Sequence, residues 1–153
     1  MTGIIIEKYE DAFKVVPLLV ALMPMLMDTG GNCGTQASTL IIRGMALDEI
    51  RPRDFLRVFW TELRVSTLVG TALAIANGIR IYLQYHNAAL ALVIAFTLGL
   101  VVIVAKLLGC CLPMLVKSVH LDPALVASPL LTTFVDICSV TIYFTIATYI
   151  MKL

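Results

Sequence analysis

The stretch PMLMDTGGNCGTQ, residues 24–36, lies inside an apolar segment of the chain. It brings a carboxylate, an amide pair, hydroxyl groups and three glycines into a region that is otherwise apolar. Backbone that Gly and Pro loosen must find hydrogen-bond partners, and hydrocarbon supplies none. The stretch therefore predicts a membrane helix that is interrupted at these residues and lines a polar cavity.

The composition of the whole chain is that of a membrane protein. Of its 153 residues, 60% are hydrophobic and 14% are charged, whereas soluble domains are about half apolar and about a quarter charged. The net charge is +1 and no run of Lys and Arg with interleaved aromatic residues occurs, so we expect no nucleic-acid partner. The cysteine spacings do not suit zinc, and no hydrolase, zinc-protease or phosphate-loop motif is found, so we do not expect an enzyme.

Four segments are long and apolar enough to cross a membrane, at about 15–42, 63–84, 88–117 and 124–151, given that a crossing needs about 20 residues. They predict an all-α, polytopic membrane helical bundle that occupies residues 1–153 as one transmembrane domain, with the lipid bilayer as its surroundings. Asp48 or Asp54 is expected to cap the amphipathic segment after the first span. Asp122 and Pro123 predict a turn followed by a helix with Pro at its first position.

The basic residues predict the orientation in a cell membrane. Five arginines lie in residues 43–64, and Lys117 and His120 lie in residues 117–122. The positive-inside rule makes both loops cytoplasmic, so residues 85–87 and both ends of the chain, including the C-terminus, are expected outside. An outside amino terminus without a signal peptide suggests that a preceding helix is missing, and we expect the chain to be a fragment of a protein with five membrane helices.

Three charged residues fall deep within the expected spans, namely Asp28, Lys106 and Asp136. Each costs about 2.5–3.5 kcal/mol at the bilayer centre on insertion scales, so each needs a partner or a function. Asp28 is expected either to face the mouth of a pore or to cap a helix that restarts near Gly30 and Gly31. Lys106 is expected to be a structural counter-charge or a snorkelling residue.

Asp136 has the surroundings of a cation ligand. Thr132 and Thr133 precede it by four and three residues and so share its helix face, and Pro129 leaves the carbonyl of residue 125 without its helical partner. Oxygen ligands of this kind suit a hard divalent cation, and a hydrated Mg²⁺ ion does not need a tight cage. Two Asp136 side chains around a dimer axis would match its charge. The alternative is that Asp136 is protonated or pairs with Lys106 and serves only as a structural contact inside the bundle.

The opening stretch has two interpretations that can coexist. Gly30 and Gly34 form a GxxxG spacing, which favours close helix packing as well as pore lining. Asn32 and Gln36 lie four residues apart, so their amides share one face of a helix.

The chain resembles the membrane domain of the MgtE family of magnesium transporters over nearly its whole length. Residues 24–36, 42–47 and 122–136 carry the resemblance. It implies a homodimeric, Mg²⁺-selective pore built mainly from the first and fourth spans, with Asp136 as the ion-binding carboxylate at its midpoint. The residues it implies near the same ion are Gly30, Gly31, Asn32 and Thr132.

Asp28, Gln36 and Thr133 are further candidates for pore lining. Mg²⁺ is the expected transported ion, with Mn²⁺ and Co²⁺ as further candidates. In a full-length member of the family, cytoplasmic amino-terminal and CBS domains sense Mg²⁺ and close the pore, and this sequence contains neither.

Two other functions are open at this point. A proton- or Na⁺-coupled carrier of divalent cations would use Asp136 as its proton site. A non-transporting membrane assembly subunit would use the GxxxG spacing and the polar residues only to pack.

Overall fold

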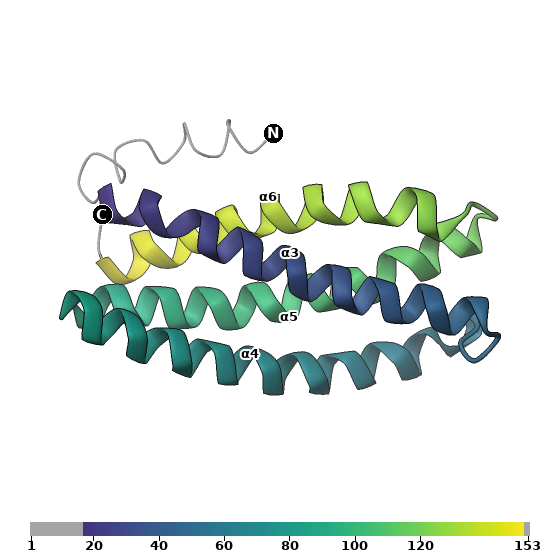
Figure 1. Ribbon diagram of the computed structural model, residues 1–153, viewed down its shortest axis with the longest axis horizontal. Helices are drawn as coiled ribbons and strands as arrows, with labels where there is room; N and C mark the ends of the chain where they lie inside the picture. The colour runs from purple at the N-terminus through teal and green to yellow at the C-terminus, as the bar shows by residue number, and fades with distance from the viewer. Residues whose placement is uncertain (1–16, 152–153) are drawn as a thin grey trace.

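The structure is a computed structural model that describes residues 17–151, apart from the side chains of residues 126 and 128. These residues form four long α-helices joined by short connections (Figure 1). The helices are α3 (Pro17–Ala46), α4 (Phe55–Tyr85), α5 (Ala88–Ser118) and α6 (Pro123–Met151), and a 3-10 helix, η1 (Pro52–Asp54), precedes α4. The part of the chain that is described contains no strand, which agrees with the all-α prediction.

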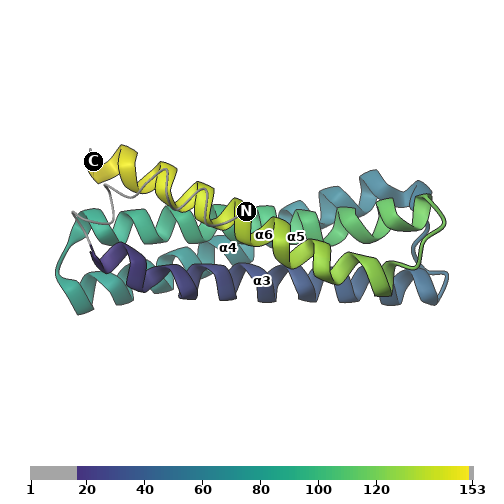
Figure 2. The ribbon, with the colours of Figure 1, turned by 90° about the horizontal axis from the view of Figure 1, so that it is seen from above.

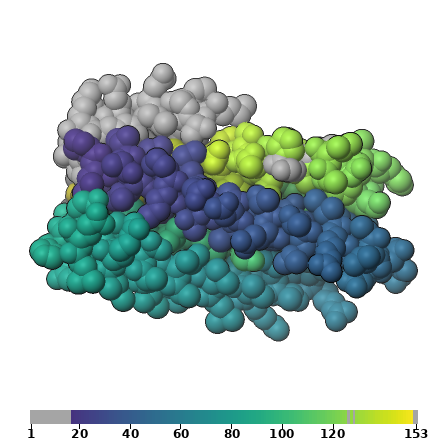
Figure 3. All heavy atoms as spheres, in the orientation of Figure 1, coloured from purple at the N-terminus to yellow at the C-terminus, as the bar shows by residue number. Residues whose placement is uncertain are grey.

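α5 is the central helix of the bundle. It packs against α3, α4 and α6, and α3 also packs against α6. Figure 2 shows α6 crossing the bundle obliquely, while Figure 3 shows α3 lying along one face between α4 and α6. α5 is also the most uniformly apolar helix, as expected for an element that is covered on several sides.

Three segments of the described chain are long and apolar enough to cross a membrane: Pro52–Tyr85, Ala88–Ser118 and Pro129–Met151. They agree with the second, third and fourth predicted spans. α3 has 30 residues, which is also long enough to cross, but its polar stretch makes it too polar to be counted with these three. The first predicted span therefore stays a prediction.

The predicted interruption of the first helix is wrong, because α3 is continuous from Pro17 to Ala46. Hydroxyl groups in the polar stretch bond to carbonyls of the preceding turn, with Thr29 Oγ1 donating to Met25 O at 2.8 Å and Thr35 Oγ1 donating to Gly31 O at 2.8 Å. These bonds satisfy polar atoms inside the helix without breaking it. No helix restarts near Gly30 and Gly31, so Asp28 does not cap one.

The predicted amphipathic segment and the second predicted span form one continuous helix. α4 begins at Phe55, so only the residues between Ala46 and Phe55, which include η1, connect α3 to α4. Asp54 stands at the position before α4, but its side chain makes no cap bond to that helix and accepts a hydrogen bond from Arg51 N at 3.0 Å. Asp48 lies in the turn after α3, where its φ is 57°. Neither residue caps α4.

The connection between α5 and α6 is as predicted. α6 begins with Pro123, and Asp122 Oδ1 accepts a hydrogen bond from Ala124 N at 2.8 Å. Proline is favoured at this position because its missing N–H would have no helical partner there.

Candidate functional site

One exposed face of α3 carries a row of polar side chains at spacings of three and four residues. We call this row the α3 stripe; it consists of Asp28, Asn32, Thr35, Gln36 and Thr39, all exposed. Four of these residues and Leu40 line an open groove of about 580 Å³. This spacing keeps side chains on one side of a helix, so the continuity of α3 is what aligns them.

Within the stripe, Asp28 and Asn32 interact directly. Asn32 Nδ2 donates a hydrogen bond to Asp28 Oδ2 at 3.2 Å. The bond fixes the amide so that its carbonyl oxygen points away from the carboxylate, which leaves that oxygen available as an acceptor. The prediction that Asn32 and Gln36 share one face of the helix is confirmed, because both side chains are exposed and line the same groove.

The opposite face of α3 is closely packed, and Gly30 belongs to it. A Cβ atom placed on Gly30 would lie 2.7 Å from Val101 Cγ1, 3.1 Å from Val135 Cγ1 and 3.2 Å from Ser139 Oγ. Gly30 thus lets α5 and α6 approach α3. A Cβ on Gly31 would meet no atom within 4 Å, so this glycine is on the open side.

On α6, Thr132 and Thr133 are exposed and Asp136 is half-buried. Thr132 Oγ1 and Thr133 Oγ1 donate to the carbonyl oxygen of Pro129 at 3.1 and 3.0 Å. Because each hydroxyl uses its proton within the helix, its oxygen can only accept at the surface. The face therefore presents oxygen atoms and a carboxylate, which is the ligand chemistry of a hard cation.

α3 and α6 meet beside these residues. A Cβ on Gly34 would lie 3.5 Å from both Leu131 Cδ1 and Val135 Cγ2. Thr132 and Asp136 each follow one of these contact residues along α6. A second, smaller groove of about 300 Å³ lies between the two helices toward the end of α3 and is lined by Thr35, Ser38, Thr39, Ile42, Arg43, Ala124 and Leu131.

The residues described in one copy of the chain do not close around an ion. Among them, no group of three or more His, Cys, Asp or Glu side chains is arranged to hold a metal. Asp28 and Asp136 lie on different helices, α3 and α6. The roles predicted for the residues of the stripe and of α6 in ion binding stay predictions.

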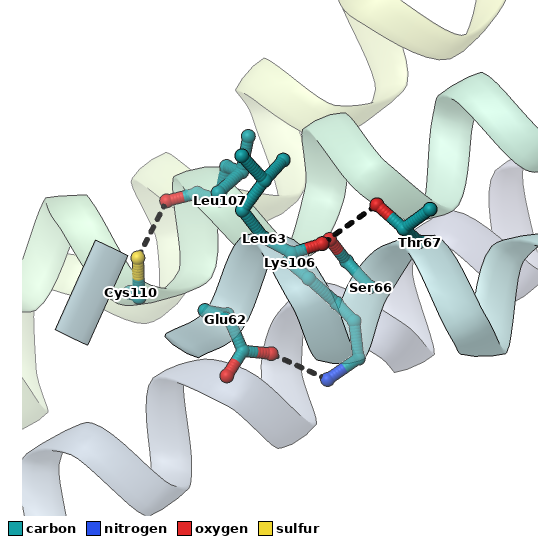
Figure 4. A network of polar contacts seen from close by, with 7 residues as sticks. All are labelled: Glu62, Leu63, Ser66, Thr67, Lys106, Leu107 and Cys110. Carbon is teal, nitrogen blue, oxygen red and sulfur yellow. Dashed lines mark hydrogen bonds and ion pairs between the residues drawn. The ribbon is translucent and has the colours of Figure 1, made fainter. Parts of the chain in front are cut away.

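Lys106 has a partner that the sequence did not suggest. Its Nζ atom lies 2.5 Å from Glu62 Oε1 of α4 (Figure 4). Lys106 therefore has an ion-pair partner, as the prediction of a counter-charge requires, and the alternative in which it pairs with Asp136 is wrong. Glu62 was missed because the second span was expected to begin at about residue 63, which leaves Glu62 outside it. The helical run of apolar residues from Phe55 onward was the available signal.

A family model and individual known proteins both assign the chain to the same family. A family model described as MgtE, divalent cation transporter, matches residues 23–146. Proteins named magnesium transporter MgtE are similar to the chain: those of Bacillus subtilis and Thermus thermophilus are each 36% identical, over 97% and 99% of this chain and 33% and 34% of their own length. That of Enterococcus faecalis is 30% identical over 99% of the chain and 33% of its own. The chain spans about a third of the length of these relatives, and it belongs to the MgtE family of divalent cation transporters.

Proposed function

We propose that the chain forms the membrane pathway of a Mg²⁺ transporter, through which ions enter the cell down their electrochemical gradient. The observation that carries the proposal is the α3 stripe. It is a row of exposed amide, hydroxyl and carboxylate groups on a membrane-length helix, packed beside the helix that bears Asp136. Membership of a divalent cation transporter family supports the same function.

The stripe argues for a second copy of the chain. Lipid hydrocarbon cannot hydrogen-bond to Asn32, Gln36 or Thr39, so leaving them against acyl chains would be costly. In a homodimer whose copies face each other through α3 and α6, the stripes would surround a water-filled path. Two Asp136 carboxylates would then supply two negative charges for one divalent ion.

Such a path suits Mg²⁺ better than a site of thiolate or imidazole ligands would. This ion loses its waters reluctantly and binds oxygen, so amide and hydroxyl oxygens can hold its hydration shell while the carboxylates balance its charge. A divalent ion gains about 4.6 kcal/mol on crossing 100 mV, twice the value for one charge. This is enough to drive entry without a coupled ion. Mn²⁺ and Co²⁺ share this ligand preference in part and are candidates for slower transport.

The proposed orientation has the connection between α3 and α4, and the one between α5 and α6, in the cytoplasm. Figure 1 places both connections at the same end of the bundle. Arg51 and Arg53 in the first connection, and Lys117 and His120 near the second, are exposed. Basic residues at one end favour the cytoplasmic side, so the connection between α4 and α5 and the C-terminus would be outside.

The experiment is Mg²⁺ uptake by proteoliposomes that contain the unsubstituted chain, Asp136→Ala or the control Thr145→Val, which changes an exposed residue of the same helix. We expect Asp136→Ala to lower uptake at least about tenfold, with the dimer intact by chemical crosslinking, and Thr145→Val to have no effect. Loss of the dimer together with uptake would favour the assembly-subunit function. Uptake that stops when proton and Na⁺ gradients are collapsed would favour a coupled carrier.

A further inference from the structure

The ion pair between Lys106 and Glu62 is largely buried in the bundle. Lys106 Nζ lies 2.5 Å from Glu62 Oε1, and the two side chains are 9% and 14% exposed. Both residues belong to segments long and apolar enough to cross a membrane. The contact joins α4 to α5, as Figure 4 shows. Because both charges are largely withdrawn from water, each is neutralised mainly by the other.

The two helices also cross closely about two turns away from the pair. A Cβ on Gly70 would lie 3.0 Å from the carbonyl oxygen of Gly99. Glu62 is about two turns from Gly70 along α4, and Lys106 is about two turns from Gly99 along α5. Ser66, fully buried, lies between the crossing and the pair on α4. The two backbones are therefore also held together at Gly70 and Gly99, independently of the ion pair.

Lys106 lies at the same level of the bundle as Asp136. Ala105, Leu131 and Val135 form one buried cluster between α5 and α6. Lys106 follows Ala105 in the chain, and Asp136 follows Val135. A positive charge at Lys106 would thus lie at the same level as a cation beside Asp136 and would repel it, although the ammonium group extends toward Glu62 of α4 and not toward α6. The interior of the bundle screens such an interaction far less than water does.

We propose that Glu62 is a positioning residue for cation entry, which neutralises Lys106 so that no unpaired positive charge stands at the level of Asp136. The proposal rests on the proposed function, because it assumes that a divalent cation passes Asp136. An uncompensated ammonium would repel Mg²⁺ with twice the force it exerts on a monovalent ion. Removing the lysine instead would leave a carboxylate, which attracts cations.

This role and a purely structural role predict different directions of change when one partner of the pair is substituted. If the pair only holds α4 to α5, breaking it from either side leaves one buried charge and damages the protein alike. If Glu62 shields the cation path, Glu62→Gln and Lys106→Gln act in opposite directions on the Mg²⁺ concentration that gives half-maximal uptake. That concentration, not the maximal rate, is the decisive readout.

The experiment measures uptake against Mg²⁺ concentration in proteoliposomes with an entrapped magnesium-sensitive dye. We expect Glu62→Gln to raise the half-maximal concentration at least about fivefold, and Lys106→Gln to leave it unchanged or lower it. The double variant Glu62→Gln with Lys106→Gln is expected within about twofold of the unsubstituted chain. The matched control is Thr67→Val, which removes an exposed hydroxyl on α4 that bonds only to Leu63 O within its own helix, at 2.7 Å, and should change nothing.

A rise of the half-maximal concentration in both single variants, or in neither, would overturn the proposal. The double variant contains no buried charge at this position, so a shift beyond fivefold there would also overturn it, even if Glu62→Gln does not fold. Asp136→Ala separates the two proposals. If it abolishes uptake while Glu62→Gln leaves the curve unchanged, only the role of Glu62 fails; if it leaves uptake intact, the proposed function itself fails.

Discussion

Gly34 of α3 and Gly109 of α5 pack backbone against backbone, and a Cβ atom on Gly109 would collide with the carbonyl oxygen of Gly34. A Cβ on Gly34 would in turn lie 3.1 Å from Ala105 O. Small residues allow such approaches between membrane helices. This crossing fixes α3 against the central helix and so sets which of its faces carries the exposed stripe.

The first prediction concerns this crossing. Gly109→Ala should lower the free energy of unfolding by about 1–3 kcal/mol, because the added methyl group meets backbone that cannot rotate away. Gly31→Ala is the matched control, since its Cβ would meet no atom within 4 Å and alanine favours the helix. Thermal unfolding in detergent measures both. Equal destabilisation by the two substitutions would mean that the α3–α5 contact is not as close as described.

The second prediction concerns the contact between the start of α3 and the C-terminal half of α6. Tyr143, which is buried, donates a hydrogen bond from its hydroxyl to Leu19 O at 2.9 Å. Tyr143→Phe removes the donor while keeping the ring, so it should cost about 0.5–1.5 kcal/mol of stability. Mg²⁺ uptake per folded molecule should not change, because the residue does not belong to the stripe. A large loss of uptake without a loss of stability would contradict this assignment.

The third prediction tests the stripe. Asn32→Leu removes an amide that lines the groove and bonds to Asp28. If the groove carries hydrated Mg²⁺, the loss of one hydrogen bond to a charged species should lower uptake by about tenfold or more. Thr61→Val, an exposed hydroxyl-to-methyl change on α4, serves as the control. Uptake by Asn32→Leu equal to that of the control would remove the stripe from the path.

The fourth prediction uses the ion as a ligand. A cation that binds the folded dimer should raise its unfolding temperature, because mass action stabilises the bound state by about 2.7 kcal/mol at one hundred times the dissociation constant. We expect Mg²⁺ to raise the unfolding temperature of the unsubstituted chain and to have little effect on Asp136→Asn. An equal rise in both proteins would place the binding site elsewhere.

The sequence predicted the long helices well because hydropathy and length determine them. The extent of α5 and α6 and the Asp122–Pro123 turn agree closely with prediction. The course of α3 was not predictable in the same way, since Gly30 and Gly31 indicate a break as readily as a packing surface. Only the tertiary contacts of Gly30 with Val101 and Val135 decide for packing.

The partner of Lys106 shows a second limit. Whether a charged residue lies in a membrane span depends on where the helix begins, and Glu62 was placed just outside the second span. A pair that joins residues 44 positions apart leaves no periodic signal in one sequence. The role of Asp136 as an ion ligand stays a prediction, which its neighbours Thr132 and Thr133 suggest because they share its helix face.

The most direct test of the account is a structure of the chain determined with Mg²⁺ in a lipid bilayer. We expect two copies that face each other through α3 and α6, with ion density between their Asp136 carboxylates on a two-fold axis. Copies joined through other helices, or density that lies away from Asp136, would contradict it.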